Sequence, residues 1–582
     1  MTPDPAGFTA DGIDSQAWEE AVAAALNALA AEFSLAEERR GNTAERYASS
    51  AGGRSAEPAS VSQRSTWLDT FDWRLHKAGL TLEYLPGRGG SELRLASRAR
   101  AGAARGSASS PAGQDGVPEQ AAVQPVTGWQ ASRPHLLADL AGGPVGTRLA
   151  ALIEPRALVP VADTAVATTV YRLLNADSKT VARLVVSRPR LVSGRQATPL
   201  PPRLAIAEVR GYQVQERRAV RLLAAVPGLS PAVEPLLADA LRALGRRAGD
   251  YSNKVDAAIT GAMPAAAAAA AILLRLLDTI EVNVPGVLAD IDTEFLHDLR
   301  VSVRRTRSAL KLFGDVLGLT RKELAFFAAE FKWVGDVTTP TRDLDVHLLD
   351  FEETARGLAA AKPDDLEPFR AFLEQRRRKE FRALARGLRG ARFTALTADW
   401  RRRLAAVQAS SAGPARASAT RSGQSGRASV GRAGLLAAER TRVTFAKVAR
   451  QGAAITADSP AESLHDLRKR CKELRYALEF FAPLHDGAAS AKVVGDLKRL
   501  QDCLGEFQDT EIQIAEIRAL AAAMHAAGEV PAVTLLAMGE ITASLAARQR
   551  AARADFERRF AAFAGIDGQR RVSALLRGGA SR

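Results

Sequence analysis

Cysteine is almost absent from this chain: its 582 residues include only two, Cys471 and Cys503. Two thiols cannot build the disulfide framework on which small secreted domains rely, and both lie at apolar positions of helical patterns. The opening stretch MTPDPAGFTADGID has neither the basic start nor the apolar core of a secretory signal. We therefore expect a cytoplasmic protein.

Long apolar runs and aromatic residues are also scarce. The longest apolar run, residues 265–274, has ten residues, about half of the roughly 20 that a membrane-spanning helix needs. We expect a buried helix that begins after Pro264, and no membrane partner. Aromatic residues make up only 5% of the chain, which disfavours single-stranded nucleic acid as a partner, because such binders stack bases on aromatic rings.

Basic residues, in contrast, are abundant. The formal net charge is +15 and the sequence pI is near 10.2, which favours a polyanionic partner such as nucleic acid, an anionic membrane or a phosphate chain. A chain of this length exceeds one ordinary hydrophobic core, so we expect two or three domains.

The secondary structure predicted from the sequence changes near residue 231. Before it, short segments rich in β-branched residues, such as TTVYRLL and ARLVVSRPRL, predict an antiparallel sheet with a few helices. After it, long helical patterns dominate. The predicted domains are a β-rich domain at 1–230, a linker helix at 231–255 and an all-helical domain at 256–575.

Three stretches rich in Ser, Gly, Ala and Arg interrupt these domains. Such segments cannot bury enough apolar surface to become ordered, so we expect disordered inserts. They lie near 41–62, near 97–125 and at 409–434. The last one divides the helical domain into halves at about 256–408 and 435–575.

The two helical halves are related by duplication. FLHDLRVSVRRTRSALKLF (295–313) and SLHDLRKRCKELRYALEFF (463–481) share nine of nineteen positions. Residues 331–346 also align without gaps on 497–512, which pairs Lys332 with Lys498 and Asp343 with Asp509. The chain therefore contains the same helical unit twice.

Each repeated helix is predicted to be amphipathic with a basic stripe. On a helical wheel the basic residues His297, Arg300, Arg304, Arg307 and Lys311 fall within an arc of about 80°. The predicted core-facing side of the same helix carries Leu296, Leu299, Val303, Leu310 and Phe313. In the second copy Glu479 replaces Lys311. Basic stripes usually just cover a solvated face, but such faces normally mix both signs of charge because like charges at i,i+4 repel. A row of cations about 20 Å long suits a linear polyanion.

With these motifs, and with RDLDV (342–346) and LKRLQDCLGEFQD (497–509), the C-terminal part resembles the CHAD family, the conserved-histidine α-helical domain. The resemblance implies two pseudo-symmetric four-helix bundles that bind inorganic polyphosphate, without catalysis, metal or cofactor, in a basic groove or tunnel between them. Polyphosphate would then be the partner, and the protein would be expected to associate with polyphosphate granules in the cytoplasm. The residues implicated are His297, Arg300, Arg304, Arg307, Lys311, Lys332, Arg342, His465, Arg468, Lys472, Arg475, Tyr476 and Lys498.

The N-terminal part resembles a degenerate CYTH-like, or triphosphate-tunnel, domain. The similarity rests on WLDTFDWRLHKAGLTLEYL (67–85) and AEVRGYQV (207–214). Active members of that family need a Glu-x-Glu-x-Lys strand, which is missing here, and Glu83 stands where they have an arginine. The expected fold class is thus multidomain α+β, a CYTH-like β domain followed by an all-α CHAD domain.

Several alternatives stay open at this stage. A triphosphatase activity of the N-terminal domain would make the protein an enzyme, and a nucleic acid is a rival for the basic stripes, although no nucleic-acid-binding motif is present. The His297-Asp298 and His465-Asp466 pairs resemble those of metal phosphohydrolases, but surrounding arginines would repel a divalent cation. We therefore predict no metal site.

Overall fold

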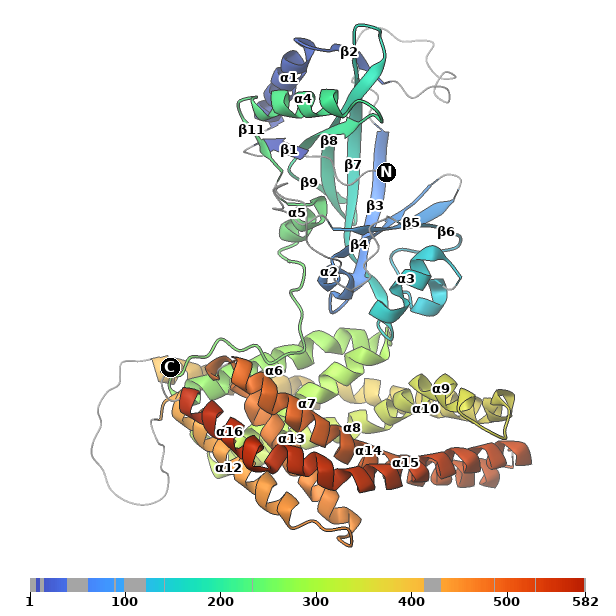
Figure 1. The fold of residues 1–582 in the computed structure, drawn as a ribbon, viewed down its shortest axis with the longest axis vertical. Coiled ribbons are helices and arrows are strands. Elements are labelled where there is room, and N and C mark those ends of the chain that lie inside the picture. Colours follow the sequence, from blue (N-terminus) through green and yellow to red (C-terminus); the bar gives the residue numbers. More distant parts are fainter. Residues whose placement is uncertain are drawn as a thin grey trace. The chain divides into compact units, whose positions relative to one another are not determined.

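The structure is a computed structural model that describes residues 7–10, 15–38, 61–87, 90–98, 122–140, 142–232, 234–412, 431–485, 487–528 and 530–579. The chain forms two compact units, Met1–Ser252 and Asn253–Arg582. The first is built around a sheet and the second is helical (Figure 1). This arrangement confirms the predicted α+β class with the β-rich part first.

The N-terminal unit contains an antiparallel sheet in which β11, β1, β10, β8, β7, β3, β4, β5 and β6 are neighbours in that order. Strand β2 also pairs with β7, and β9 with β8. The described strands are β1 Gly7–Ala10, β2 Ser34–Glu37, β3 Val61–Thr70, β4 Leu80–Leu85, β5 Ser91–Ser97, β6 Ala122–Val126, β7 Leu158–Leu174, β8 Thr180–Ser193, β9 Gln196–Pro199, β10 Arg203–Glu208 and β11 Leu229–Pro231.

Helices cover parts of this sheet and close its two larger hydrophobic cores. One core packs α1 and α4 on β7, β8 and β10 around Trp18, Leu29 and Leu184. The other packs α2, η1 and α3 on β3, β4 and β5 around Leu82, Leu93 and Leu149. The helical segments are α1 Ser15–Ala30, α2 Arg74–Lys77, the 3₁₀ turn η1 Leu137–Leu140, α3 Pro144–Ile153, α4 Gln213–Ala224 and α5 Leu236–Ala243.

The turn after β3 is organised by Asp69, which is 4% exposed. Its carboxylate accepts hydrogen bonds from the backbone N–H groups of Thr70 at 2.7 Å, Leu75 at 3.0 Å and His76 at 2.9 Å. Burial raises the pKa of Asp69 to about 6, although these three donors oppose the shift. This carboxylate shapes the chain into the α2 turn.

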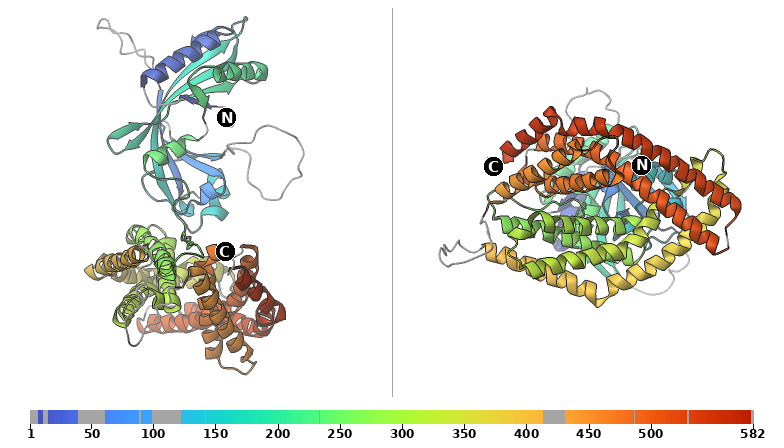
Figure 2. Two further views of the ribbon diagram at one scale, coloured as in Figure 1. Left: turned by 90° about the vertical axis from the view of Figure 1, so that its left-hand side faces the viewer. Right: turned by 90° about the horizontal axis from the view of Figure 1, so that it is seen from below.

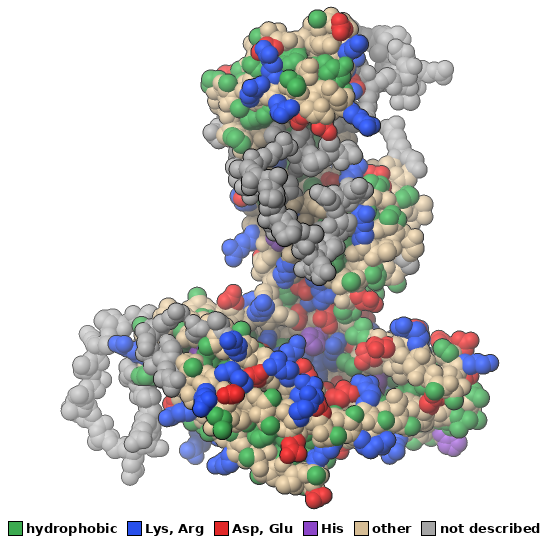
Figure 3. Space-filling view, viewed as in Figure 1, with side chains coloured by type: hydrophobic (Ala, Val, Ile, Leu, Met, Phe, Trp, Pro, Cys, Tyr) green, Lys and Arg blue, Asp and Glu red, His purple; other side chains and the backbone are tan. Residues whose placement is uncertain are grey.

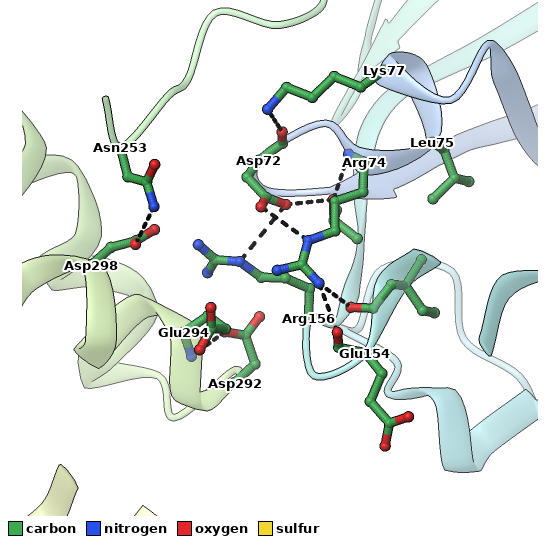
Figure 4. A network of polar contacts seen from close by, with 12 residues as sticks. Asp72, Arg74, Leu75, Lys77, Glu154, Arg156, Asn253, Asp292, Glu294 and Asp298 are labelled. Carbon is green, nitrogen blue, oxygen red and sulfur yellow. Dashed lines mark hydrogen bonds and ion pairs between the residues drawn. The ribbon is translucent and has the colours of Figure 1, made fainter. Parts of the chain in front are cut away.

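Next to it, Asp72 forms a network of arginine contacts (Figure 4). Arg74 Nε lies 3.0 Å from Asp72 Oδ2, and Arg156 Nε lies 3.7 Å from Asp72 Oδ1. Arg74 also donates to the carbonyls of Ile153 and Glu154, which ties α2 to the end of α3. The contacts of Asp69, Asp72 and Arg74 thus give the DTFDWR segment (69–74) a structural role in this turn.

We predict that Asp69→Asn destabilises the N-terminal unit. The amide NH₂ cannot accept, so at least one buried backbone N–H loses its acceptor, which costs about 1–3 kcal/mol. Urea unfolding of the full chain, followed by tryptophan fluorescence, should show this decrease. Asp163→Asn is the control, because Asp163 is an exposed residue that accepts from Thr66 and should change stability by less than about 0.5 kcal/mol. Equal stability of the two variants would contradict the role of Asp69.

The linker predicted to be helical over 231–255 is helical only at α5, Leu236–Ala243. Gly245 and Gly249 follow with φ of +69° and +81°, a left-handed conformation that ends a helix and that glycine adopts without steric cost. The predicted inserts lie largely outside the described residues. The edges of the inserts were wrongly assigned. Residues 61–62 begin strand β3, Ser97 ends β5, residues 122–125 begin β6, and residues 409–412 and 433–434 belong to helices.

The helical unit consists of two successive sets of helices. The first half holds α6 Ala265–Leu288, α7 Thr293–Phe313, η2 Gly314–Val316, α8 Arg321–Leu349, α9 Phe351–Arg356, η3 Pro363–Leu366, α10 Glu367–Arg389 and α11 Ala391–Ala412. The second half holds α12 Ala433–Ala453, α13 Ala461–Phe480, η4 Ala482–Leu484, α14 Gly487–Ala526, α15 Ala532–Ala564 and α16 Ile566–Gly579. Across the described residues, no helix has the length and apolar character that a bilayer span requires.

Each half is a four-helix bundle whose last helix is broken. In the first, α6, α7 and α8 pack with the α10–α11 pair, and in the second, α12, α13 and α14 pack with the α15–α16 pair. The breaks fall at Gly390 and Gly565, whose extended ψ angles of 152° and 179° interrupt the helices. The predicted duplication therefore appears as two similar bundles (Figure 2).

Among the described residues, apolar side chains join the halves in at least two places. At the end of α7, the Phe313 ring lies 5.7 Å from the ring centroids of both Phe480 and Phe481, and all three rings are fully buried. A second core joins the far ends of both bundles, with Phe351, Phe369 and Leu373 on one side and residues of α14 and α15 on the other. These two joints fix α7 and α13 beside each other.

Candidate functional site

The basic stripe of the first half lies on α7, whose position is set by its cap and its apolar face. Asp292 accepts hydrogen bonds from the backbone N–H groups of Glu294 at 2.9 Å and Phe295 at 3.3 Å, and thereby caps the helix start. The predicted apolar residues are all buried: Leu296, Leu299, Val303, Leu310 and Phe313. Arg304 and Lys311 are exposed, and His297, Arg300 and Arg307 are half-buried. The amphipathic pattern predicted for this helix matches the burial.

The second stripe lies on α13, which repeats this arrangement. Its buried set is Leu464, Leu467, Cys471, Leu474, Leu478 and the following Phe481. His465, Arg468, Lys472 and Arg475 are half-buried on the other side. Burial raises the pKa of the Cys471 thiol to about 12, so this cysteine stays a neutral core residue.

Arg300 is held against α8 by neutral groups. Its Nη1 donates to Thr339 Oγ1 at 2.7 Å, to Thr338 Oγ1 at 3.2 Å and to the Gly335 carbonyl at 3.4 Å. Burial lowers the pKa of Arg300 to about 10, with Asp343 opposing the shift and Arg304 adding to it. Arg300 is thus a charged group that keeps its charge at neutral pH.

The equivalent residue in the second half, Arg468, is held by a carboxylate. Its Nη2 lies 2.9 and 3.0 Å from the two oxygens of Asp509, and its Nη1 donates to Gln508 Oε1 at 2.8 Å. Gly505 stands where the first half has Thr339, so the second half has no hydroxyl at this position, and the Arg468 guanidinium lies 3.7 Å from where a Cβ of residue 505 would be. The duplicated arginines therefore occupy similar places with different partners.

The two stripes approach each other at Arg304 and Lys472. Burial lowers the pKa of Lys472 to about 8, and the next largest contributions come from Arg468 and Arg304, while Asp509 opposes the shift. Arg304 belongs to α7 and Lys472 to α13, so charges from both halves act on one ammonium group. Within the described residues, neither side chain has a hydrogen bond or an ion pair.

Glu479 forms a bridge between the halves. Its carboxylate accepts from Arg475 Nε at 2.6 Å and from Arg305 Nη2 at 2.9 Å. Arg305 also donates to the Asn253 carbonyl at 2.7 Å. We did not predict a role for Arg305. The signal was Glu479 itself, because a carboxylate inside a basic arc needs a cation beside it.

At the start of each stripe, the His-Asp pair contacts other parts of the helical unit. His465 Nε2 lies 2.7 Å from Glu511 Oε2 on α14. The neighbour of His297, Asp298, is 1% exposed and accepts from Asn253 Nδ2 at 2.8 Å (Figure 4). Asp298 is therefore used to fasten residue 253 to α7. No group of three or more His, Cys, Asp or Glu in the described ranges is placed to hold a metal ion.

The remaining predicted residues lie at different depths. Arg342 donates to the Thr293 carbonyl at 3.3 Å, and Lys332 is exposed beside Asp336 at 2.6 Å. Lys498 is exposed. Tyr476 is only 6% exposed and its ring stacks on Phe480, with centroids 6.1 Å apart. Tyr476 is thus mainly a core residue.

The charge of the two halves is unequal, although their folds correspond. In the second half His465, Arg468 and Arg475 each lie beside a carboxylate. In the first half Arg300 has hydroxyl and carbonyl acceptors, and Arg304, Arg307 and Lys311 have no ion pair among the described residues. Figure 3 shows Lys and Arg side chains gathered over the helical unit with Asp and Glu among them. Of the two stripes, the one on α7 therefore holds more of the cations that have no carboxylate beside them among the described residues.

Comparisons with known proteins relate the helical unit to a family. Residues 271–518 match the family model described as the CHAD domain. The crystal structure of the CHAD domain from the plant Ricinus communis shares 24% identity and a TM-score of 0.44, covering 54% of this chain and 96% of that one. PptA from Streptomyces chartreusis shares 17% identity and a TM-score of 0.38, covering 51% and 99%. No curated protein matches the chain.

Proposed function

Because residues 271–518 of the chain match the CHAD-domain family model, we propose that the protein binds inorganic polyphosphate between the two halves of its helical unit. The observation that carries the proposal is the convergence of Arg304 and Lys472, which come from different halves and have no ionic partner among the described residues. Like charges brought together in this way cost free energy, and a bound polyanion would offset that cost.

The side chains suit phosphate chemistry. Guanidinium groups bind phosphate oxygens through two parallel hydrogen bonds, and a lysine adds a compact charge. Arg304, Arg307 and Lys311 supply cations along α7, and Arg300 remains charged next to them. On α13, phosphate oxygens would share Arg468 with Asp509. We infer that α7 contributes more of the affinity than α13.

We propose binding without catalysis. The runner-up is a triphosphatase activity of the N-terminal unit, whose antiparallel sheet is compatible with a CYTH-like fold. Against it stand the sequence departures: Glu83 on β4 replaces an expected arginine, and Glu208 is the only acid of the AEVRG strand. A nucleic acid is the other rival, favoured only by the net charge.

One titration separates these functions. Full-length protein is titrated with polyphosphates of several lengths while released phosphate is monitored. Binding without phosphate release supports the proposal, whereas steady release would favour the triphosphatase. In a competition arm, polyphosphate should displace a labelled DNA duplex completely, and excess duplex should not displace polyphosphate. The reverse order of displacement would make nucleic acid the partner.

The affinity should fall as the pH rises through the pKa of Lys472. Its pKa is about 8, with Arg304, Arg468, Arg475 and Asp509 as the charged groups around it. A polyanion favours the ammonium form, so binding is strongest below this pKa and weakens above it. Between about pH 7 and about pH 9 we expect about a tenfold loss, the loss of one charge-assisted contact.

The matched control is Lys472→Arg, which keeps the charge over this whole range. Its affinity should stay nearly constant with pH, whereas the wild-type affinity should decline. A parallel decline in both proteins would show that another group titrates.

A further inference from the structure

A second row of cations lies on α10, away from both stripes. Lys379, Arg382, Arg386 and Arg389 are all exposed and follow one another at spacings of three, four and three residues. On the helix they fall within an arc of about 80° and extend over about 15 Å. The buried residues Leu384 and Leu388 occupy the opposite face. We call these four residues the outer row.

The outer row lacks the compensation that other exposed arginines have. In the described part of the chain none of its four residues has a hydrogen bond or an ion pair. On the neighbouring α11, by contrast, Arg392 pairs with Glu330 at 2.8 Å, Arg401 with Asp278 at 2.7 Å and Arg403 with Glu323 at 3.1 Å. Like charges three and four residues apart repel each other, so the row is unfavourable in the isolated protein.

The nearest acids on α10 do not correct this. Glu380 lies about 100° around the helix from Lys379, and Glu374 is 3.7 Å from a different residue, Arg378. The helix dipole favours cations in the last turn, which accounts for Arg386 and Arg389. It does not account for Lys379 and Arg382.

The duplication shows that the bundle does not need these cations. The broken last helices align without gaps, with Gly390 on Gly565 and Glu380-Phe381 on Asp555-Phe556. In this alignment the outer row falls on Ala554, Glu557, Ala561 and Ala564 of α15. The same fold is therefore built in the second half with no cation at any of the four positions.

We propose that the outer row is a second docking strip for a linear phosphate polymer, occupied by the part of a long polyphosphate chain that extends beyond the site at α7 and α13. This inference rests on the proposed function. A chain held at one site has a raised effective concentration at a second site, so weak contacts on α10 would add to the affinity for long chains only. In the right-hand view of Figure 2, α10 and α11 form one outer edge of the helical unit.

The strip suits a bare phosphate chain better than a nucleic acid. Single-stranded nucleic acid is bound by stacking its bases on aromatic rings. Phe381, the aromatic residue within the row's span, is half-buried with the Arg377 guanidinium 5.7 Å from its ring centroid. The row therefore offers charge without a platform for bases.

The test compares long-chain polyphosphate with tripolyphosphate, which is too short to reach both sites. The variant replaces Lys379, Arg382, Arg386 and Arg389 with Gln in the full-length chain. The control replaces Arg402, Arg548, Arg558 and Arg570 with Gln, because these arginines are exposed and sit beside carboxylates. Both proteins lose the same net charge, so a difference between them reports on position.

The expected result is about a tenfold loss of affinity for long chains in the outer-row variant only, with tripolyphosphate binding unchanged. The slope of log affinity against log salt should also decrease by about 0.7 for each cation removed. Equal affinity for long chains in variant and control overturns the inference, as does a loss confined to a labelled RNA or DNA. If wild-type protein binds no polyphosphate at all, the proposed function fails first and the inference with it.

Discussion

Replacing Arg304 and Lys472 with Gln in one variant lowers the affinity for long-chain polyphosphate by at least about 100-fold. Each residue would lose a charge-assisted hydrogen bond to phosphate, worth about 1.5–3 kcal/mol, and tenfold in affinity corresponds to about 1.4 kcal/mol. Isothermal titration at fixed salt measures the effect. This pair is the most direct probe because neither residue has an ion pair among the described residues. Its substitution therefore leaves no carboxylate without an ionic partner.

The control for this variant is Arg402→Gln with Arg558→Gln, which removes the same charge from exposed positions that pair with Asp399 and Asp555. It should bind almost as the wild type does. Arg300→Ala with Arg468→Ala should also weaken binding strongly, but it leaves Asp509 without its partner. Unchanged affinity in the Arg304 and Lys472 variant would remove the basis for placing polyphosphate between α7 and α13.

Replacing Phe313 with Ala lowers the free energy of unfolding of the helical unit by about 3–5 kcal/mol. Phe313 is fully buried and contacts Phe480 and Phe481 across the two halves. Removing the ring deletes its buried area and leaves a cavity in the joint between the bundles, which partly collapses. Urea unfolding followed by circular dichroism at a helical wavelength measures the change.

Phe326→Ala is the matched control, because that ring is 52% exposed and its removal creates little cavity. We expect a change several times smaller than for Phe313. Since the joint also fixes α7 beside α13, Phe313→Ala should weaken polyphosphate binding even at temperatures where the protein stays folded. Similar stability losses in both variants would show that the halves are held together elsewhere, for example by the core of α10, α14 and α15.

The sequence predicted correctly which side chains are buried where this depends on the residue pattern of a single helix. The heptad-like spacing of Leu296, Leu299, Val303 and Leu310 predicted the buried face of α7, and the repeat predicted the same face on α13. Both are confirmed by the burial of these side chains. A helical pattern specifies which residues share a face, and that information is local.

The partners of the arginines could not be predicted, because they come from other helices. Thr338 and Thr339 around Arg300, and Asp509 beside Arg468, lie 38 to 41 residues away in sequence. The wheel gave the angle of Tyr476 but not the neighbouring Phe480 ring that buries it. The linker was misassigned for another reason: the helical pattern was extended past Gly245, whose positive φ angle directly follows the C-cap of α5.

The glycine breaks in the last helix of each bundle also indicate the order in which the helix interruption and the duplication arose. A feature found at matching positions of both copies is most simply inherited from their common ancestor, so the interruptions at Gly390 and Gly565 preceded the gene duplication. The cations of α10 occur in one copy alone, as do the threonines that hold Arg300. The two copies have therefore diverged in surface chemistry while retaining the inherited backbone, and their common ancestor was itself a bundle with an interrupted final helix.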